Sequence, residues 1–179
     1  FDHRGCGESD LSFGEQNLST RVADMRAVLE HFDPPSCVLF GSSFGGKVVF
    51  HVAVEDSRVK SVGTRAPVTY TEPFERYRST GAEAGFGGVA DDFFDDLNSY
   101  DFTEVEEGLE APVVVFHGRD DATVSLEDSL EATGALETDV TLHAYVDEGH
   151  GFSRDAEERL RDQLFGWLGT KESGESLER

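Results

Sequence analysis

Lysine, cysteine and long apolar runs are scarce in this chain of 179 residues, and each scarcity excludes a class of protein. Only three lysines occur, and a formal net charge of −22 would repel nucleic acid and anionic membranes, so we expect neither as a partner. The two cysteines, Cys6 and Cys37, are too few for a disulfide framework. No apolar run approaches the roughly 18 residues that a membrane span needs, and no signal peptide is visible. We therefore expect a cytoplasmic protein.

Acidic residues, in contrast, are abundant: 37 Asp and Glu stand against 15 Lys and Arg. The chain does not have the composition of a disordered acidic tail, because 37% of it is hydrophobic and its 14 phenylalanines require a core. An acid-rich, lysine-poor surface around an ordinary core resembles halophilic proteins, because molar salt screens repulsion between carboxylates to within about 3 Å. An acidic mesophilic protein is the alternative. The length corresponds to one domain.

Short apolar runs alternate with helical patterns, which indicates an α/β fold with a mostly parallel sheet and helices on both faces. The first helix is predicted to begin at an N-cap, Ser19 or Thr20, and to end near Phe32. Further helices are predicted over residues 46–55, 91–100, 125–136 and 155–169. Strands are predicted over 37–40, 58–68, 111–118 and 139–146, the first of them buried on both faces. We expect one domain over 1–170, a small lid-like insertion over 69–111 and a frayed tail over 171–179.

The segment Gly-Ser-Ser-Phe-Gly at 41–45 separates a predicted strand from a predicted helix. In that context Gly-x-Ser-x-Gly is a nucleophile elbow, a turn so sharp that the serine side chain projects free at the carboxyl end of the sheet. Glycines are needed on both sides because the strand and helix backbones approach closely. Ser43 has Gly41 and Gly45 two residues away, whereas Ser42 has phenylalanines there, so Ser43 is the candidate nucleophile. An ordinary Gly/Ser loop is the alternative.

A serine hydroxyl becomes a good nucleophile when a base takes its proton, and an acid must orient that base. In folds with this elbow the partners follow in the order Ser, Asp or Glu, His, at the same edge of the sheet. The predicted strand 111–118 leads into His-Gly-Arg-Asp-Asp, and the strand 139–146 leads into Asp-Glu-Gly-His. These loops supply Asp120 or Asp121 as the acid and His150 as the base.

Four segments in this order make the chain resemble the α/β-hydrolase family. They are FDHRGCGES at 1–9, GSSFGG at 41–46, PVVVFHGRDDATVS at 112–125 and EGHGF at 148–152. The resemblance, to carboxylesterase-like and serine-aminopeptidase-like members, implies a serine hydrolase with Ser43, Asp121 and His150 as catalytic residues. It also implies that the backbone N–H of Phe44 serves the oxyanion hole, and it implies no metal and no organic cofactor.

The resemblance further implies that the chain lacks the N-terminal strands of the fold. The first segment, 1–9, is similar to the turn that follows the fourth of eight strands. We therefore expect earlier strands, and the loop with the second oxyanion donor, to lie upstream. The strand 37–40 would then be an exposed edge, and the chain alone neither stable nor appreciably active.

We expect a small-molecule acyl substrate, an ester or an amide, cleaved through an acyl-enzyme intermediate. Aromatic side chains of the insertion are candidates to cover or line an acyl pocket: Tyr70, Phe74, Tyr77 and Phe86. An acyltransferase or a thioesterase on the same fold is an alternative, as is a non-catalytic binding protein. The sequence does not indicate an oligomeric state.

The acidic composition predicts that the folded chain gains stability between low and molar KCl. The reason is the net charge of −22, because repulsion among the acidic side chains is least screened at low ionic strength. Thermal melts across that range should show a rising Tm. A Tm that stays constant or falls with added salt would contradict the halophilic interpretation and would leave the enzymatic hypothesis untouched.

Overall fold

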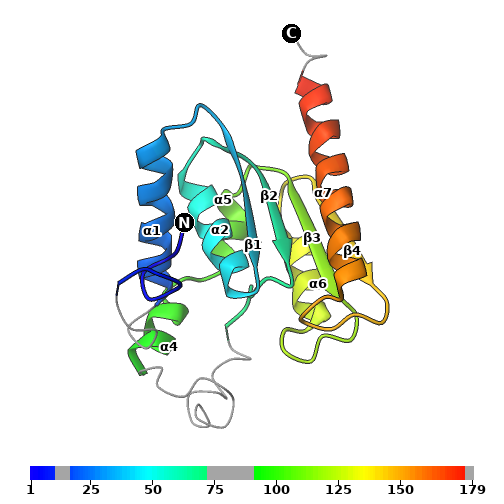
Figure 1. Cartoon of the computed structure of the whole chain (residues 1–179), viewed down its shortest axis with the longest axis horizontal. Coiled ribbons are helices and arrows are strands. Elements are labelled where there is room, and N and C mark those ends of the chain that lie inside the picture. The colour runs from blue at the N-terminus through cyan, green and yellow to red at the C-terminus, as the bar shows by residue number, and fades with distance from the viewer. Residues whose placement is uncertain (11–16, 72–90, 176–179) are drawn as a thin grey trace.

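The described domain is built around a sheet of four parallel strands (Figure 1). The computed structural model describes residues 1–10, 17–71 and 91–175. The strands pair in the order β1 (Cys37–Ser42), β2 (Val59–Arg65), β3 (Val113–Gly118) and β4 (Val140–Tyr145). Because each pairing is parallel, the carboxyl ends of all four strands meet at one edge of the sheet. The predicted parallel sheet is therefore confirmed.

Helices cover both faces of this sheet. One face carries α1 (Leu18–Phe32), α2 (Phe44–Glu55), α5 (Thr103–Gly108) and α6 (Leu126–Ala135), with α4 (Asp91–Asn98) packed against α1. The other face carries α7 (Arg154–Glu175), which Figure 1 shows alongside β3 and β4. Among the described residues, every helix is too short or too polar to cross a membrane.

The side chains of β3 alternate between two cores. Val113 and Val115 join the core that contains α1, α2 and α5, whereas Val114 and Phe116 pack with α7. Successive strand residues point to opposite faces, so a strand with helices on both sides is apolar at nearly every position. All of β3 is buried, as the sequence predicts for such a run.

β1 differs from that prediction. Val38 and Phe40 are 44% and 42% exposed, while Leu39 between them is 7% exposed. The prediction that this strand is buried on both faces is therefore wrong for the described chain. The physical reason is that β1 is an outer strand of the described sheet, and α7 packs chiefly against β3.

The observed ends of α1 and α7 differ from those predicted from the sequence. Asn17, and neither Ser19 nor Thr20, caps α1, because its side chain accepts a hydrogen bond from the Thr20 amide at 2.8 Å. α7 continues to Glu175, beyond the predicted end at residue 169 and into the segment predicted to fray. Residues 176–179 lie outside the described residues.

The described part of the insertion packs against the body of the domain. The ring of Tyr70 lies edge-on to Phe102 at 5.6 Å, and its hydroxyl donates to Glu106 at 2.9 Å. Phe102 in turn packs against Phe50 of α2 at 5.3 Å. Tyr70 thus contributes to the domain core beside α5. The other three aromatic residues named for an acyl pocket lie outside the described residues: Phe74, Tyr77 and Phe86.

Two titratable side chains are buried in α2. The Nζ of Lys47, which is fully buried, donates to the Thr69 carbonyl at 2.9 Å, and burial lowers the pKa of this amine to about 8. His51 is 4% exposed, and no described residue hydrogen-bonds to its Nε2. Burial first, and the neighbouring Lys47 charge second, lower the pKa of His51 to about 3.

The depressed pKa of His51 predicts a loss of stability in acid. Below its ordinary pKa of 6.5 the histidine takes up a proton in the unfolded chain, whereas in the folded chain it stays neutral down to about pH 3. Neutral His51 therefore makes its full contribution to the free energy of unfolding above pH 6.5. As the pH drops from 6.5 toward 3, that free energy falls by about 1.4 kcal/mol per pH unit. Urea unfolding between about pH 6 and 4 should therefore show a flatter decline for His51→Leu than for the wild type. His31→Leu, at an exposed position, is the matched control, and parallel curves for wild type and His51→Leu would contradict the prediction.

Candidate active site

Ser43 forms the turn between β1 and α2, at the carboxyl edge of the sheet. Its backbone has φ 54° and ψ −120°, a region that costs a non-glycine residue about 1–3 kcal/mol. Three backbone hydrogen bonds hold the turn. The Ser43 N–H donates to the Arg65 carbonyl at 2.8 Å, and the Ser43 carbonyl accepts from the N–H groups of Gly46 at 2.9 Å and Val68 at 3.1 Å. This strained strand–turn–helix geometry is that of a nucleophile elbow.

At the elbow, the backbone of α2 approaches most closely at Gly41. A Cβ on Gly41 would lie 2.1 Å from the carbonyl oxygen of Gly45, which no side chain tolerates. The sequence predicts the same need at Gly45, but a Cβ there would meet no atom within 4 Å in the described structure. That part of the prediction is wrong, because Gly41 alone makes room for the helix backbone. A Cβ on Gly46, the next residue, would lie 2.6 Å from the Cβ of Pro67.

The structure brings Ser43, His150 and Asp121 together from three different elements. His150 Nε2 lies 2.9 Å from Ser43 Oγ, and His150 Nδ1 lies 2.8 Å from Asp121 Oδ2. Since a carboxylate only accepts, Nδ1 carries the ring proton, and Nε2 is left to accept the Ser43 O–H. The Asp121 side chain is fully buried, whereas the His150 side chain is 28% exposed. The imidazole therefore lies between a buried acid and solvent.

Asp121, and not its exposed neighbour Asp120, is the carboxylate that contacts His150. Its Oδ1 accepts hydrogen bonds from the amides of Thr123 and Val124, at 2.8 and 2.9 Å. Burial by itself raises the pKa of Asp121, but these amides and the His150 ring together outweigh burial and hold the pKa below its usual value. The carboxylate consequently stays charged in the folded state through the neutral range.

A second histidine, His117, contacts the same carboxylate. Its Nε2 lies 3.1 Å from the Val124 carbonyl and 3.3 Å from Asp121 Oδ2, so this nitrogen carries the proton. The Ser129 hydroxyl, 2.8 Å from Nδ1, donates to the other nitrogen. Burial lowers the pKa of His117 and keeps the ring neutral. Sequence reasoning missed this contact, and the signal available was the four-residue spacing from His117 to Asp121.

Gly118 allows the loops that carry Asp121 and His150 to touch. A Cβ on Gly118 would lie 2.2 Å from the carbonyl oxygen of Glu148. The same carbonyl accepts a hydrogen bond from the amide of Asp120 at 2.9 Å. A backbone hydrogen bond therefore joins the loop after β3 to the loop after β4. Its donor, Asp120, is adjacent to Asp121, and its acceptor, Glu148, is two residues before His150.

Phe44 follows the nucleophile and begins α2. Its ring lies 5.6 Å from Phe93 of α4, and the Arg21 guanidinium lies 5.5 Å from its centre. The amide of Phe44 is in the first helical turn, where N–H groups have no partner within the helix. The positive end of the helix dipole adds to its attraction for an anion.

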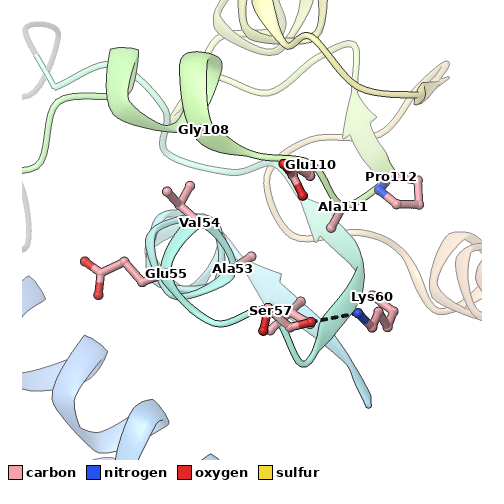
Figure 2. A pocket seen from close by; sticks show the side chains of 10 residues that line it. Ala53, Val54, Glu55, Ser57, Lys60, Gly108, Glu110, Ala111 and Pro112 are labelled. Atoms are coloured by element: carbon pink, nitrogen blue, oxygen red, sulfur yellow. Dashed lines mark hydrogen bonds between the residues drawn. The ribbon is translucent and has the colours of Figure 1, made fainter. Parts of the chain in front are cut away.

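Neither a metal cluster nor the hollow drawn in Figure 2 belongs to this site. Within 1–10, 17–71 and 91–175, no group of three or more His, Cys, Asp or Glu side chains could hold a metal ion. A hollow of about 510 Å³ lies at the amino ends of β2 and β3, the edge opposite the elbow (Figure 2). There the Nζ of Lys60 donates to the Ser57 carbonyl at 2.8 Å, and the candidate nucleophile is absent from the lining.

The parallel sheet, the elbow and the order of the three loops define an α/β hydrolase. The family model of the prolyl oligopeptidase family matches residues 14–172, and the chain belongs to this family. A putative hydrolase from Agrobacterium vitis S4 is similar with a TM-score of 0.75 and 25% identity, over 92% of this chain and 74% of that one. Est1E from Butyrivibrio proteoclasticus has the same fold, with a TM-score of 0.75 and 17% identity over 94% and 76% of the two chains. A non-heme chloroperoxidase of Streptomyces lividans is 24% identical over 219 residues, which cover 93% of this chain and 79% of the relative.

The elbow geometry predicts opposite results for alanine at its two flanking glycines. Gly41→Ala should destabilise the fold by about 1–3 kcal/mol, because its Cβ must displace the helix backbone. Gly45→Ala, the matched control, should be neutral or stabilising by up to about 1 kcal/mol, because alanine favours the helix and meets open space. Urea unfolding of both variants measures the difference. Equal destabilisation would show that the crowding is not confined to Gly41.

Proposed function

We propose that this chain carries the catalytic centre of a serine hydrolase that cleaves a small ester or amide through an acyl-enzyme intermediate. The observation that supports the proposal is the unbroken chain of hydrogen bonds from Asp121 through His150 to Ser43, with distances of 2.8 and 2.9 Å. The buried Asp121 carboxylate can only accept hydrogen bonds, so it fixes the direction of donation: His150 donates to Asp121, and Ser43 donates to His150. The nucleophile is thus paired with a base in the protonation state that the reaction needs.

The proposed reaction follows from this direction of hydrogen bonding. Ser43 Oγ attacks the acyl carbon while its proton passes to His150 Nε2, and the carbonyl π electrons move to oxygen. The resulting imidazolium is stabilised by the Asp121 carboxylate. As the tetrahedral intermediate collapses, the bond to the leaving group breaks and His150 returns the proton to that group. A water molecule then repeats the sequence and releases the acid and free Ser43.

The Phe44 amide is the proposed donor to the developing oxyanion. It is adjacent to the nucleophile in sequence, and the strained turn at Ser43 directs the start of α2 toward the carboxyl edge of the sheet. An oxyanion donor of this kind contributes about a hundred- to a thousand-fold in rate. The ring of Phe44, the residue after Ser43, lies 5.6 Å from the ring of Phe93, and we propose that these two rings contact the acyl chain.

The substrate class is proposed from the mechanism and the family. An acyl-enzyme forms equally from an ester, a thioester or an amide, and membership of the prolyl oligopeptidase family favours testing aminoacyl amides beside esters. A panel of p-nitrophenyl esters of increasing chain length and aminoacyl p-nitroanilides, prolyl among them, separates these classes. Turnover of esters alone would identify an esterase, and turnover of anilides would identify a peptidase.

The proposal predicts that Ser43→Ala, made in the complete protein, removes nearly all hydrolysis, a loss of about a million-fold in comparable triads. It also predicts covalent labelling of the wild type by a fluorophosphonate, in which Ser43 Oγ displaces fluoride from phosphorus. The label should appear on the peptide that contains Ser43 in mass spectrometry, and it should be lost in Ser43→Ala.

Ser57→Ala is the matched control, because Ser57 lies at the opposite edge of the sheet (Figure 2). It should label and turn over like the wild type. A complete wild-type protein that resists the probe, under conditions where it melts cooperatively, would contradict a catalytic serine and favour a binding protein on this fold.

A further inference from the structure

Arg65 is the last residue of β2, and the catalytic mechanism above does not use it. In the sheet it pairs with Ser42 of β1 on one side and with Phe116 of β3 on the other. It therefore lies between the strand that carries the nucleophile and the strands whose loops carry the acid and the base. Its side chain is 24% exposed and extends on the face covered by α7.

Arg65 contacts the elbow through both its backbone and its side chain. Its carbonyl accepts the N–H of Ser43 at 2.8 Å, and its Nε donates to Ser42 Oγ at 2.9 Å. The two serines of the motif thus have different partners: Ser43 Oγ meets His150, whereas Ser42 Oγ meets Arg65. The guanidinium consequently holds the residue immediately before the candidate nucleophile.

The same guanidinium contacts the segment that follows the base. Its Cζ lies 5.7 Å from the centre of the Phe152 ring, within cation–π range, and Phe152 is only two residues after His150. Nη1 pairs with Glu157, in the first turn of α7, at 3.2 Å. Glu157 is 58% exposed, so this ion pair adds little stability by itself. Its main effect is to orient the plane of the guanidinium.

We propose that Arg65 is a positioning residue that keeps Ser43 and His150 at hydrogen-bonding distance, an inference that rests on the proposed function. Ser43 and His150 follow β1 and β4, which are not neighbours in the sheet, so no strand pairing links them directly. Arg65 bridges the elbow and the base loop with one planar group, whose donors point in fixed directions. A displacement of about 1 Å between reacting groups costs about a hundred-fold in rate, so such a bridge acts on turnover.

Arg65→Met tests this role, because it keeps the apolar stem and removes the planar cation. We expect kcat and the rate of fluorophosphonate labelling to fall by about ten- to a hundred-fold, with KM within about twofold. Arg65→Lys should recover part of the loss, since an ammonium group can meet Ser42 or Glu157 but lacks the fork that spans both. Arg154→Met is the matched control: it removes the exposed ion pair of Arg154 with Glu158 in α7 and should leave both rates unchanged.

Ser42→Ala keeps the proposal testable even if Arg65→Met does not fold. It removes only the acceptor of Nε, so labelling should slow by about three- to tenfold. The double variant should be no slower than Arg65→Met alone, because both changes break the same bridge. Rates equal to the wild type in Ser42→Ala and Arg65→Met, with a lowered Tm, would overturn the inference and leave Arg65 a structural residue. An unlabelled wild type would instead overturn the proposed function and this inference with it.

Discussion

The turn at Ser43 is the constraint on which the rest of the site depends. The chain must pass from a strand to a helix within one residue. This requires a positive φ at a serine and a close approach of Gly41 to the Gly45 carbonyl. The strained backbone of Ser43 is maintained because several contacts around it hold it in place. The Arg65 carbonyl and the Val68 amide hold Ser43 from the neighbouring strand and the loop after it, and α2 is anchored by a buried apolar face.

The elbow lies on the least covered strand of the described sheet. Val38 and Phe40 of β1 are exposed by 44% and 42%, because within the described sheet β1 pairs only with β2 and α7 packs against β3. The bridge made by Arg65 belongs to this arrangement, because it ties the outer strand to the segment after His150.

The candidate acid shows how a buried charge is maintained. Burial alone would raise the pKa of Asp121, but two backbone amides, His150 and His117 surround its carboxylate. His117 is itself held in one tautomer by Ser129 of α6 and the Val124 carbonyl. A neutral N–H that faces the carboxylate stabilises its charge without competing for the proton of His150. The acid is therefore oriented from the side of α6 as well as from its own loop.

Much of the site was predictable from the sequence because its signals are local or ordered along the chain. The glycine spacing selects Ser43 over Ser42, and the order of strand ends supplies His150 and leaves Asp120 or Asp121 as the acid. The resemblance to the α/β-hydrolase family then selects Asp121, and the structure places Asp121 and Ser43 within 2.9 Å of His150. A continuous apolar run likewise predicts the buried strand β3. Such features need only the fixed period of a strand and the rule that parallel strands end at one edge.

Only the tertiary structure decided the remaining features, because each depends on distances between segments far apart in the chain. The one-sided need for glycine at position 41 depends on how closely the start of α2 approaches β1. Arg65 belongs to a strand pattern that gives no sign of its contacts, since Glu157 is 92 residues away in sequence. Hydrophobic periodicity predicts which face of an element is buried, but the partner of a polar side chain is set by register and packing across the whole sheet.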